Sequence, residues 1–536
     1  MRLSAACLLA FTLSGCGGNG DHLEPPVNFT ASGTVSYSDR LYTRLTTGDY
    51  GFSSGQDKPV RFATVQVLDA SGAVVAEAGT DDLGRYTVAA AGGDQEPMRL
   101  RVLARTRSGV SVTVKDLAGN VLAVSTGFAP GSLTTKLDLA VSGDLAGAFN
   151  MLDVYTAAGE FMQEMHGRPP PALTAHWQPG GTPPGGTSYF CATCPAAIYV
   201  LGGAYAGDAL AGDSDHFDDD VLLHEYGHFV EHSIGILHSP GGYHTLNDAR
   251  QDLRLAWSEG FSSFLGGAIK AWMAERRHVT LSSTDLPHSF YLDTEDDIAG
   301  GGRGLYFDFA ALPLSLRHAT NESAVAKVLW NLHDGAPGGM ANIWEAFAAN
   351  MPAVCALHPA SLETFWDGWQ ASELIASPAD EALAAFAERD VQYAPDTYEV
   401  DDVTGARDTD FVGLERHNLY KHAGAPEIDV IPFQAVVGTG YRIETYALAN
   451  GADTYLRILD ASGTPLAEND DAAPPPANTN SGCALASRID TFVPAATGRY
   501  YAEVTRSPVP RPWAGRYGGY ELRITALPSG NDPVCP

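Results

Sequence analysis

The spacing of apolar residues changes twice along the chain, and this change constrains the fold more than any other feature. From about residue 27 to 141, and again from 400 to 536, segments such as "MRLRVLAR" and "GGYELRITAL" alternate apolar and polar residues, which is typical of β-strands. From about 145 to 395, apolar residues recur every three or four positions, as a packed helix requires. A chain of 536 residues is also too long for one core. We therefore expect a multidomain protein, β-rich at both ends and mainly α (α+β) in the middle.

The first region, 27–141, contains turn and strand residues in a particular order. The order is G-x-V, then a P-V-x-x-A-x-V-x-V strand, then D-x-x-G and T-D-x-x-G-x-Y-x-V. It resembles a carboxypeptidase-regulatory-like β-sandwich, a module that usually serves as a spacer or an adhesive unit. The residues that carry this resemblance are Gly33, Val65, Val67, Gly72, Thr80, Gly84 and Tyr86. The resemblance implies a β-sandwich without catalytic residues.

The last region, 400–536, also contains ordered blocks. It resembles a bacterial pre-peptidase C-terminal domain, a β-sandwich often found beside secreted proteases. The matching blocks are Asp453-Thr454, a "DASG" turn, "ENDD" at 468–471, "SRI" at 487–489, "GRYY" at 498–501 and "GYEL" at 519–522. Within this region Asp470 and Asp471 could bind Ca²⁺, although exposed acidic turns without a metal are commoner.

The stretch "HEYGHFVEH" contains two zinc-protease signatures that share one histidine. H-E-x-x-H places His224 and His228 one turn apart on a helix, with Glu225 beside the metal as a base. H-x-x-E-H would use His228 and His232 in the same way, with Glu231 as the carboxylate. Either pair of imidazoles could reach one Zn²⁺, so helix geometry alone leaves both interpretations open.

The third metal ligand is expected from "LAWSEGFSSFLGG", which places Glu259 on a second helix, 31 residues after His228. An H-E-Y-x-H motif followed by an E-G-aromatic helix resembles the gluzincin metallopeptidases, and it is closer to the fungalysin-like type than to thermolysin. The resemblance implies a zincin-like peptidase domain at 145–395. It also implies that His224, His228 and Glu259 bind zinc and that Glu225 is the general base.

Residues around the motif refine this comparison. Gly227 favours the forward signature, because a residue without a side chain suits close packing of the metal helix. The interval between the ligands exceeds that of thermolysin, so the insertion at 235–252 is expected to form a loop near the cleft. Ser263 stands where thermolysin-like proteins carry a supporting Asp, so that support must come from another residue or be absent. The acidic residues 218–220 are expected to be a solvated run at the helix start, although one could orient a ligand imidazole.

A peptidase also needs a group that stabilises the tetrahedral oxyanion, and the sequence leaves Tyr306, His318 and His333 open for this role. The predicted reaction is hydrolysis of peptide bonds by water that zinc activates, with Glu225 accepting the proton and returning it to the leaving amine. Proteins or peptides are the expected substrates, and β modules on both sides favour an endopeptidase. The alternative is a non-catalytic adhesion or binding lipoprotein with a structural or vestigial zinc site.

The N-terminus predicts export. Arg2 precedes the short apolar run "AACLLAFTL", and "LSGC" ends at Cys16. This resembles a bacterial lipoprotein signal at 1–16, followed by a tether at 17–26; an ordinary cleaved secretory signal is the alternative. The resemblance implies a cell-envelope lipoprotein, surface-exposed or released, that touches the membrane only through the lipid on Cys16. The net charge of −31 argues against nucleic acid as a partner.

Five cysteines follow Cys16, and an exported chain permits disulfides. Cys483 and Cys535 both lie in the last region and are a plausible pair. The "CATC" at 191–194 is expected to form a small disulfide loop, with a redox pair or half of a zinc site as the alternatives. The odd number leaves one thiol without an assignment.

Overall fold

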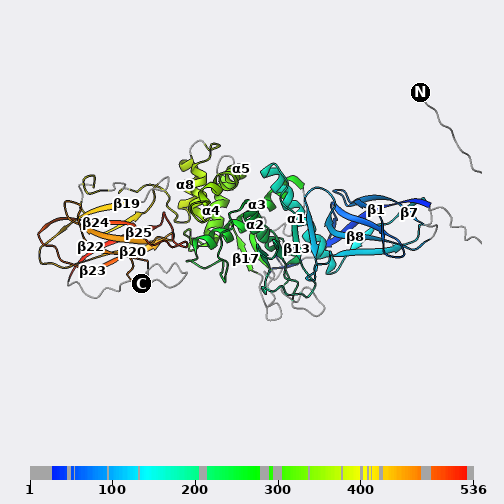
Figure 1. Ribbon diagram of the computed structural model, residues 1–536, viewed down its shortest axis with the longest axis horizontal. Coiled ribbons are helices and arrows are strands. Elements are labelled where there is room, and N and C mark those ends of the chain that lie inside the picture. Colours follow the sequence, from blue (N-terminus) through cyan, green and yellow to red (C-terminus); the bar gives the residue numbers. More distant parts are fainter. Residues whose placement is uncertain are drawn as a thin grey trace, which may run out of the picture.

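The computed structural model shows a β-rich region at each end and helices in the middle, arranged along one long axis (Figure 1). This confirms the multidomain layout that the apolar spacing predicts. The structure describes residues 27–40, 42–44, 50–52, 55–92, 96–130, 133–203, 214–277, 289–293, 305–335, 339–375, 378–396, 398, 402–406, 410–411, 413–421, 427–472 and 485–527.

Several sequence predictions fall on other parts of the chain. The lipoprotein signal with Cys16, the tether at 17–26 and the proposed pair Cys483 and Cys535 lie outside the described residues. Within the described part of the chain, no helix is both long and apolar enough to cross a membrane.

The N-terminal region is organised by its long first strand. That strand, β1, pairs antiparallel with β4 and β7 and parallel with β11 and β12, which makes a five-stranded sheet. A second sheet of eight strands has the order β14-β15-β13-β9-β8-β5-β6, with β10 on β8. The strands before the first helix are β1 (Val27–Asp39), β2 (Tyr42–Arg44), β3 (Tyr50–Phe52), β4 (Gln56–Pro59), β5 (Ala63–Leu68), β6 (Val74–Gly79), β7 (Arg85–Gly92), β8 (Met98–Thr106), β9 (Val112–Lys115), β10 (Ala123–Phe128), β11 (Thr134–Lys136) and β12 (Leu139–Val141).

The eight-stranded sheet crosses the predicted boundary between the first region and the helical region. Strand β13 (Leu173–His176) pairs in parallel with β9, and β15 (Ala197–Tyr199) and β14 (Tyr189–Cys191) continue the sheet. Helix α1 (Leu145–His166) precedes β13 in the chain and packs on β1, β8 and β9. Because strands on both sides of the boundary share one sheet, the buried side chains of the two regions form one continuous core.

The helical region is built around two long helices, α2 and α3, that pack on each other. Helix α4 packs against α3, and α1 and the edge strand β14 pack against α2. The elements of this region after β15 are a 3₁₀ helix (Asp215–Phe217), α2 (Asp219–Ile234), α3 (Leu253–Arg277), β16 (Ser289–Asp293), β17 (Leu305–Asp308), α4 (Glu322–Gly335), α5 (Gly339–Trp344), a π-helical segment (Glu345–Asn350), α6 (Met351–Cys355), α7 (Leu362–Gln370) and α8 (Pro378–Ala387).

Gly227 determines how closely α2 and α3 approach. A Cβ atom at this position would lie 2.5 Å from the Cα of Ser262, which is closer than real Cβ contacts occur. The close helix packing that the sequence predicted from Gly227 is therefore confirmed. The approach brings the histidines of α2 within reach of the glutamate and serines of α3.

The C-terminal region is a sandwich of two four-stranded sheets, with the orders β18-β25-β20-β23 and β19-β24-β21-β22. Leu456 and Ile458 on β21 are fully buried, whereas Arg457 between them is partly exposed, as a half-buried strand requires. The strands are β18 (Leu414–Asn418), β19 (Ile428–Ala435), β20 (Tyr441–Ala449), β21 (Thr454–Leu459), β22 (Pro465–Asn469), β23 (Arg488–Phe492), β24 (Gly498–Arg506) and β25 (Gly519–Ala526).

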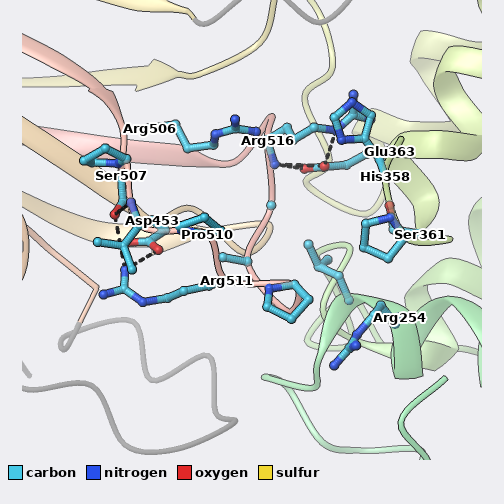
Figure 2. Close-up of a pocket in the computed structure, with 17 residues that line it drawn as sticks. Arg254, His358, Ser361, Glu363, Asp453, Arg506, Ser507, Pro510, Arg511 and Arg516 are labelled. Carbon is cyan, nitrogen blue, oxygen red and sulfur yellow. Dashed lines mark hydrogen bonds and ion pairs between the residues drawn. The ribbon is translucent and has the colours of Figure 1, made fainter. Parts of the chain in front are cut away.

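Polar contacts join the helical region to this sandwich. The carboxylate of Glu363 on α7 accepts hydrogen bonds from the backbone N–H groups of Arg516 and Tyr517, at 2.7 and 2.8 Å. The Tyr517 hydroxyl donates to Asp367 at 2.7 Å. Figure 2 shows Arg516 and Glu363 joined in this way, beside a cavity of about 330 Å³ between the two regions. Buried hydrogen bonds between α7 and the segment before β25 therefore hold the sandwich on the helices.

The short cysteine motif forms the predicted loop. Cys191 and Cys194 are joined by a disulfide at the end of β14, which confirms the small disulfide loop rather than a zinc half-site. Cys355 is a free, partly buried thiol.

Candidate metal centre

The expected zinc ligands come together where α2 packs on α3. His224 Nε2 lies 3.0 Å from Glu259 Oε2, and His228 Nε2 lies 3.3 Å from the same oxygen. The ligand atoms of the three side chains all lie within 4.8 Å of one another. Two imidazole nitrogens and a carboxylate oxygen at such distances could hold a metal ion.

Serine hydroxyls orient both imidazole rings. The Nδ1 atom of His224 lies 3.1 Å from the hydroxyl of Ser263, and Nδ1 of His228 lies 3.0 Å from Ser258 and 3.1 Å from Ser262. With Nδ1 held in this way, Nε2 of each ring is directed at Glu259. The prediction that the support of this histidine must come from a residue other than Ser263, or be absent, is wrong, because the Ser263 hydroxyl itself contacts the ring of His224.

Glu231 lies behind His228 rather than across from it. This carboxylate is fully buried, accepts a hydrogen bond from Ser258 at 2.5 Å and lies 3.6 Å from His228 Nδ1. His232 packs against the ring of Phe190, with the ring centroids 5.4 Å apart. The second half of "HEYGHFVEH" therefore supports one ligand histidine and packs on β14, and it does not form a second group of ligands with His228.

Glu225 is a buried carboxylate beside the two ligand histidines. The backbone N–H of Phe190 on β14 donates to it, and its Oε2 atom has no hydrogen-bond partner among the described residues. Burial raises the pKa of Glu225 above its ordinary value, and the nearby His228 and His224 oppose that rise. A carboxylate with an open oxygen and a raised pKa has the properties of a proton acceptor for a reacting water.

His244 and Glu322 also reach this centre, and the sequence analysis missed both. His244 Nε2 lies 3.4 Å from Glu259 Oε2 and 3.7 Å from Glu322 Oε2. Glu322 is buried at the first turn of α4, and burial, reinforced by repulsion from Glu259, raises its pKa to about 8. The insertion that carries His244 does lie at the centre, as expected, but it has no periodicity or motif that marks this residue.

An open cavity of about 580 Å³ lies beside His244 and is lined mostly by the insertion. Tyr243 stands at its rim with 94% of its surface exposed. The cavity of Figure 2 lies elsewhere, between α7 and the C-terminal sandwich, and contains none of the ligand residues. The cavity beside the insertion meets the centre at His244 and is not lined by His224, His228 or Glu259.

The three candidate oxyanion donors lie in different surroundings. His318 pairs with Asp390 at 3.4 Å and lines a cavity next to the C-terminal sandwich. His333 stacks on Trp330, with the ring centroids 5.1 Å apart. Tyr306 lies on β17, and its side chain is outside the described residues. His318 and His333 contact Asp390 and Trp330 rather than the candidate ligands, so the oxyanion donor stays unassigned.

The prediction of a solvated acidic run at the start of α2 is wrong. Asp218, Asp219 and Asp220 are all buried. Asp219 accepts a hydrogen bond from Asn150 on α1 at 3.0 Å, and Asp220 pairs with Lys270 on α3. Because α1 and α3 cover the start of α2, the carboxylates of Asp219 and Asp220 form contacts between helices instead of facing solvent.

A second acidic group lies in the C-terminal sandwich. Asp453, Asp470 and Asp471 have ligand atoms within 4.8 Å of one another, so they too could hold a metal ion. A guanidinium already occupies part of this group, because Arg511 pairs with Asp453 at 2.5 Å and with Asp471 at 2.7 Å. Calcium at Asp470 and Asp471 stays a prediction, and these ion pairs would compete with it.

Known proteins give limited comparisons. No family model matches the chain. Over 133 residues, or 24% of its length, the chain is 29% identical to an uncharacterized protein from Archaeoglobus fulgidus, and it spans 32% of that relative. Among solved structures, a 9R-lipoxygenase from Cyanothece PCC8801 is similar over 26% of this chain and 24% of its own, at 12% identity and a TM-score of 0.14. These likenesses assign neither a fold nor an activity to the centre.

Proposed function

We propose that this protein is a zinc metallopeptidase of the gluzincin type, in which His224, His228 and Glu259 bind the metal and Glu225 is the general base. The observation that carries the proposal is the convergence of His224, His228 and Glu259 at the contact between α2 and α3, with Glu225 close to both histidines. Two imidazoles and one carboxylate are a ligand set that suits zinc in a catalytic site. When bound, Zn²⁺ supplies a Lewis acid that activates water and polarises a carbonyl oxygen.

The residues of the chain have separate parts in this reaction. Ser263 and Ser258 hold Nδ1 of the two ligand histidines, which leaves Nε2 of each ring for the metal. The open Oε2 atom of Glu225 takes a proton from water and delivers it to the nitrogen of the leaving amine. The low exposure of the carboxylate favours this role, because burial brings its pKa closer to neutrality.

The surroundings of the centre support an extended peptide as the substrate. Strand β14 lies at the end of the described eight-stranded sheet, and Phe190 on this strand contacts both Glu225 and the ring of His232. An extended chain can add to an exposed sheet edge through its backbone hydrogen bonds. We therefore propose a zincin-like domain that acts as an endopeptidase on protein substrates, with the export and lipid anchor that the N-terminus predicts.

Zinc content and hydrolysis of casein test the proposal, measured on the purified full-length protein and on two variants. Glu225→Gln is expected to lower kcat by about 10²–10⁴-fold, the usual contribution of a general base, with zinc retained. Glu231→Gln is the matched control on the same helix. Because Glu231 only supports His228, this variant is expected to lose about 10–100-fold, with weaker zinc binding.

The outcomes separate the alternatives. Full zinc content without hydrolysis of casein or other proteins by the wild type would favour the non-catalytic adhesion lipoprotein. If Glu231→Gln abolishes turnover while Glu225→Gln leaves it intact, the base has been assigned to the wrong signature.

A further inference from the structure

The carboxylate of Glu259 belongs to two groups of potential ligands. On the side of α2 its Oε2 atom lies 3.0 Å from His224 Nε2 and 3.3 Å from His228 Nε2. On the side of the insertion it lies 3.4 Å from His244 Nε2, which is 3.7 Å from Glu322 Oε2. The ligand atoms of His244, Glu259 and Glu322 lie within 4.8 Å of one another, as those of the first group do. The two groups share Glu259 alone.

Several carboxylates are buried together at this centre. Four carboxylates are buried there: Glu225 (8% exposed), Glu231 (0%), Glu259 (7%) and Glu322 (2%). Within the described part of the chain, the ion pairs of Glu231, Glu259 and Glu322 go to histidines and not to Lys or Arg. Buried carboxylates are stabilised when they are paired or when they coordinate a metal ion.

The imidazole of His244 is oriented as a metal ligand. Its Nδ1 atom lies 3.0 Å from the carbonyl oxygen of Gly242, so Nδ1–H donates there and Nε2 faces Glu259 and Glu322. A backbone carbonyl on the other ring nitrogen is the usual support of a ligand histidine.

The insertion that carries His244 is tied to the start of α4. Asn321 Nδ2 donates to the carbonyl oxygens of Leu246 and Asp248, at 3.2 and 3.0 Å. The Ser323 hydroxyl donates to Leu246 O at 2.9 Å. Gln251 Nε2 donates to Glu322 Oε2 at 3.0 Å. These hydrogen bonds attach the loop of His244 to the helix of Glu322. The residues of the second group are therefore held together without a bound metal.

We propose that the centre holds two divalent cations, the first bound by His224 and His228, the second by His244 and Glu322, with Glu259 bridging them. One imidazole with two carboxylates suits zinc or manganese. The inference rests on the proposed function, which supplies the first cation, and adds a second cation at the same centre. In two-metal sites both ions act on one reaction. His244 lines the open cavity, so the second ion would lie next to it.

The test counts zinc on the full-length protein. Metal-free protein is titrated calorimetrically with Zn²⁺, and bound zinc is measured by mass spectrometry after gel filtration. The wild type is expected to bind about two zinc ions per chain, and His244→Ala and Glu322→Gln about one. Tyr243→Phe, an exposed neighbour on the same loop, should still bind two. If Glu322→Gln fails to fold, His244→Ala decides.

Cobalt gives an independent readout of the bridge. Two Co²⁺ ions joined by the Glu259 carboxylate couple magnetically, so the EPR signal per cobalt should fall when the second equivalent is added to the wild type. In His244→Ala the signal per cobalt should stay constant.

Each outcome bears on one claim. One zinc per wild-type chain, with hydrolysis of protein, overturns the second site and leaves the proposed function intact. Two zinc ions in both the wild type and His244→Ala place the second ion elsewhere and also overturn the assignment. No bound zinc overturns the proposed function itself, whereas two ions without hydrolysis keep the metal sites and refute the peptidase.

Discussion

The candidate metal centre and the acidic group of the C-terminal sandwich each bring three potential ligand side chains within 4.8 Å, yet they differ in their counter-ions. At the metal centre, Glu259 pairs with histidines, which can be neutral. In the sandwich, Asp453 and Asp471 pair with Arg511, whose charge is permanent. The difference teaches that close carboxylates alone do not define a metal site. What matters is whether the protein already supplies the compensating charge.

The largest expected effect is at the metal centre. Glu259→Gln removes a ligand carboxylate that touches His224, His228 and His244. We expect zinc affinity to fall by more than the roughly 10–100-fold known for residues that only support a ligand. Competition with a chromophoric chelator measures this. Asp471→Asn is the matched change in the sandwich and should leave zinc affinity unchanged; an equal loss in both variants would show that the two groups are alike.

Removing Arg511 would make the sandwich group resemble the metal centre. Arg511→Gln leaves Asp453 and Asp471 close together without a cation, and we expect a loss of about 2 kcal/mol in the free energy of unfolding. Millimolar Ca²⁺ should restore part of that stability in the variant and have a smaller effect on the wild type. Calorimetric melting with Ca²⁺ or with a chelator tests both statements. A variant that is as stable as the wild type would mean that the ion pairs do not compensate the group.

Support of the ligand histidine by a hydroxyl is the next smaller effect. Ser263→Ala removes the partner of His224 Nδ1, and we expect about a tenfold loss in zinc affinity or in kcat/KM. Ser263→Asp provides the carboxylate support of thermolysin-like proteins and should retain binding. Ser233→Ala, on α2 but bonded to the backbone of Phe229, is the control. A zinc affinity that does not respond to Ser263→Ala would exclude the supporting role.

The smallest effect is a difference in pH dependence between the two regions. Burial, with a smaller contribution from Arg40, lowers the pKa of His216 from 6.5 to about 3. Near pH 6 His216 is therefore protonated in the unfolded chain but stays neutral in the folded helical region. This difference lowers the free energy of unfolding by about 1 kcal/mol near pH 6. Burial also raises the pKa of Asp453 to about 6, against the effect of Arg511. The folded sandwich binds that proton first, so its contribution to stability rises between pH 6 and 4.

Melting curves from pH 7 to 5 measure these slopes. His216→Asn should reduce the loss of stability that the wild type shows as the pH falls. Asp453→Asn should remove the gain in stability that protonation of Asp453 contributes over the same range. If His216→Asn loses stability with acid as steeply as the wild type, another group causes that slope.

The relative placement of residues that share one helix could be predicted from the sequence. His224, Glu225 and His228 follow the helical repeat, and their placement on α2 needed only the spacing of the motif. Gly227 was readable for the same reason, because a missing side chain on one face permits close packing wherever the partner lies. The buried state of Asp219 was not readable, since it depends on α1 and its Asn150.

The sequence by itself determined the order of β, helical and β regions, the helix that carries the two histidines, and the disulfide loop at Cys191 and Cys194. The first two features follow from short-range periodicity, which backbone geometry imposes on any chain, and the disulfide loop follows from the close spacing of two cysteines. The tertiary structure alone decided that Glu231 supports His228 and that His244 and Glu322 join Glu259. Such contacts depend on how loops close and helices cross, and loop closure leaves no period in the sequence.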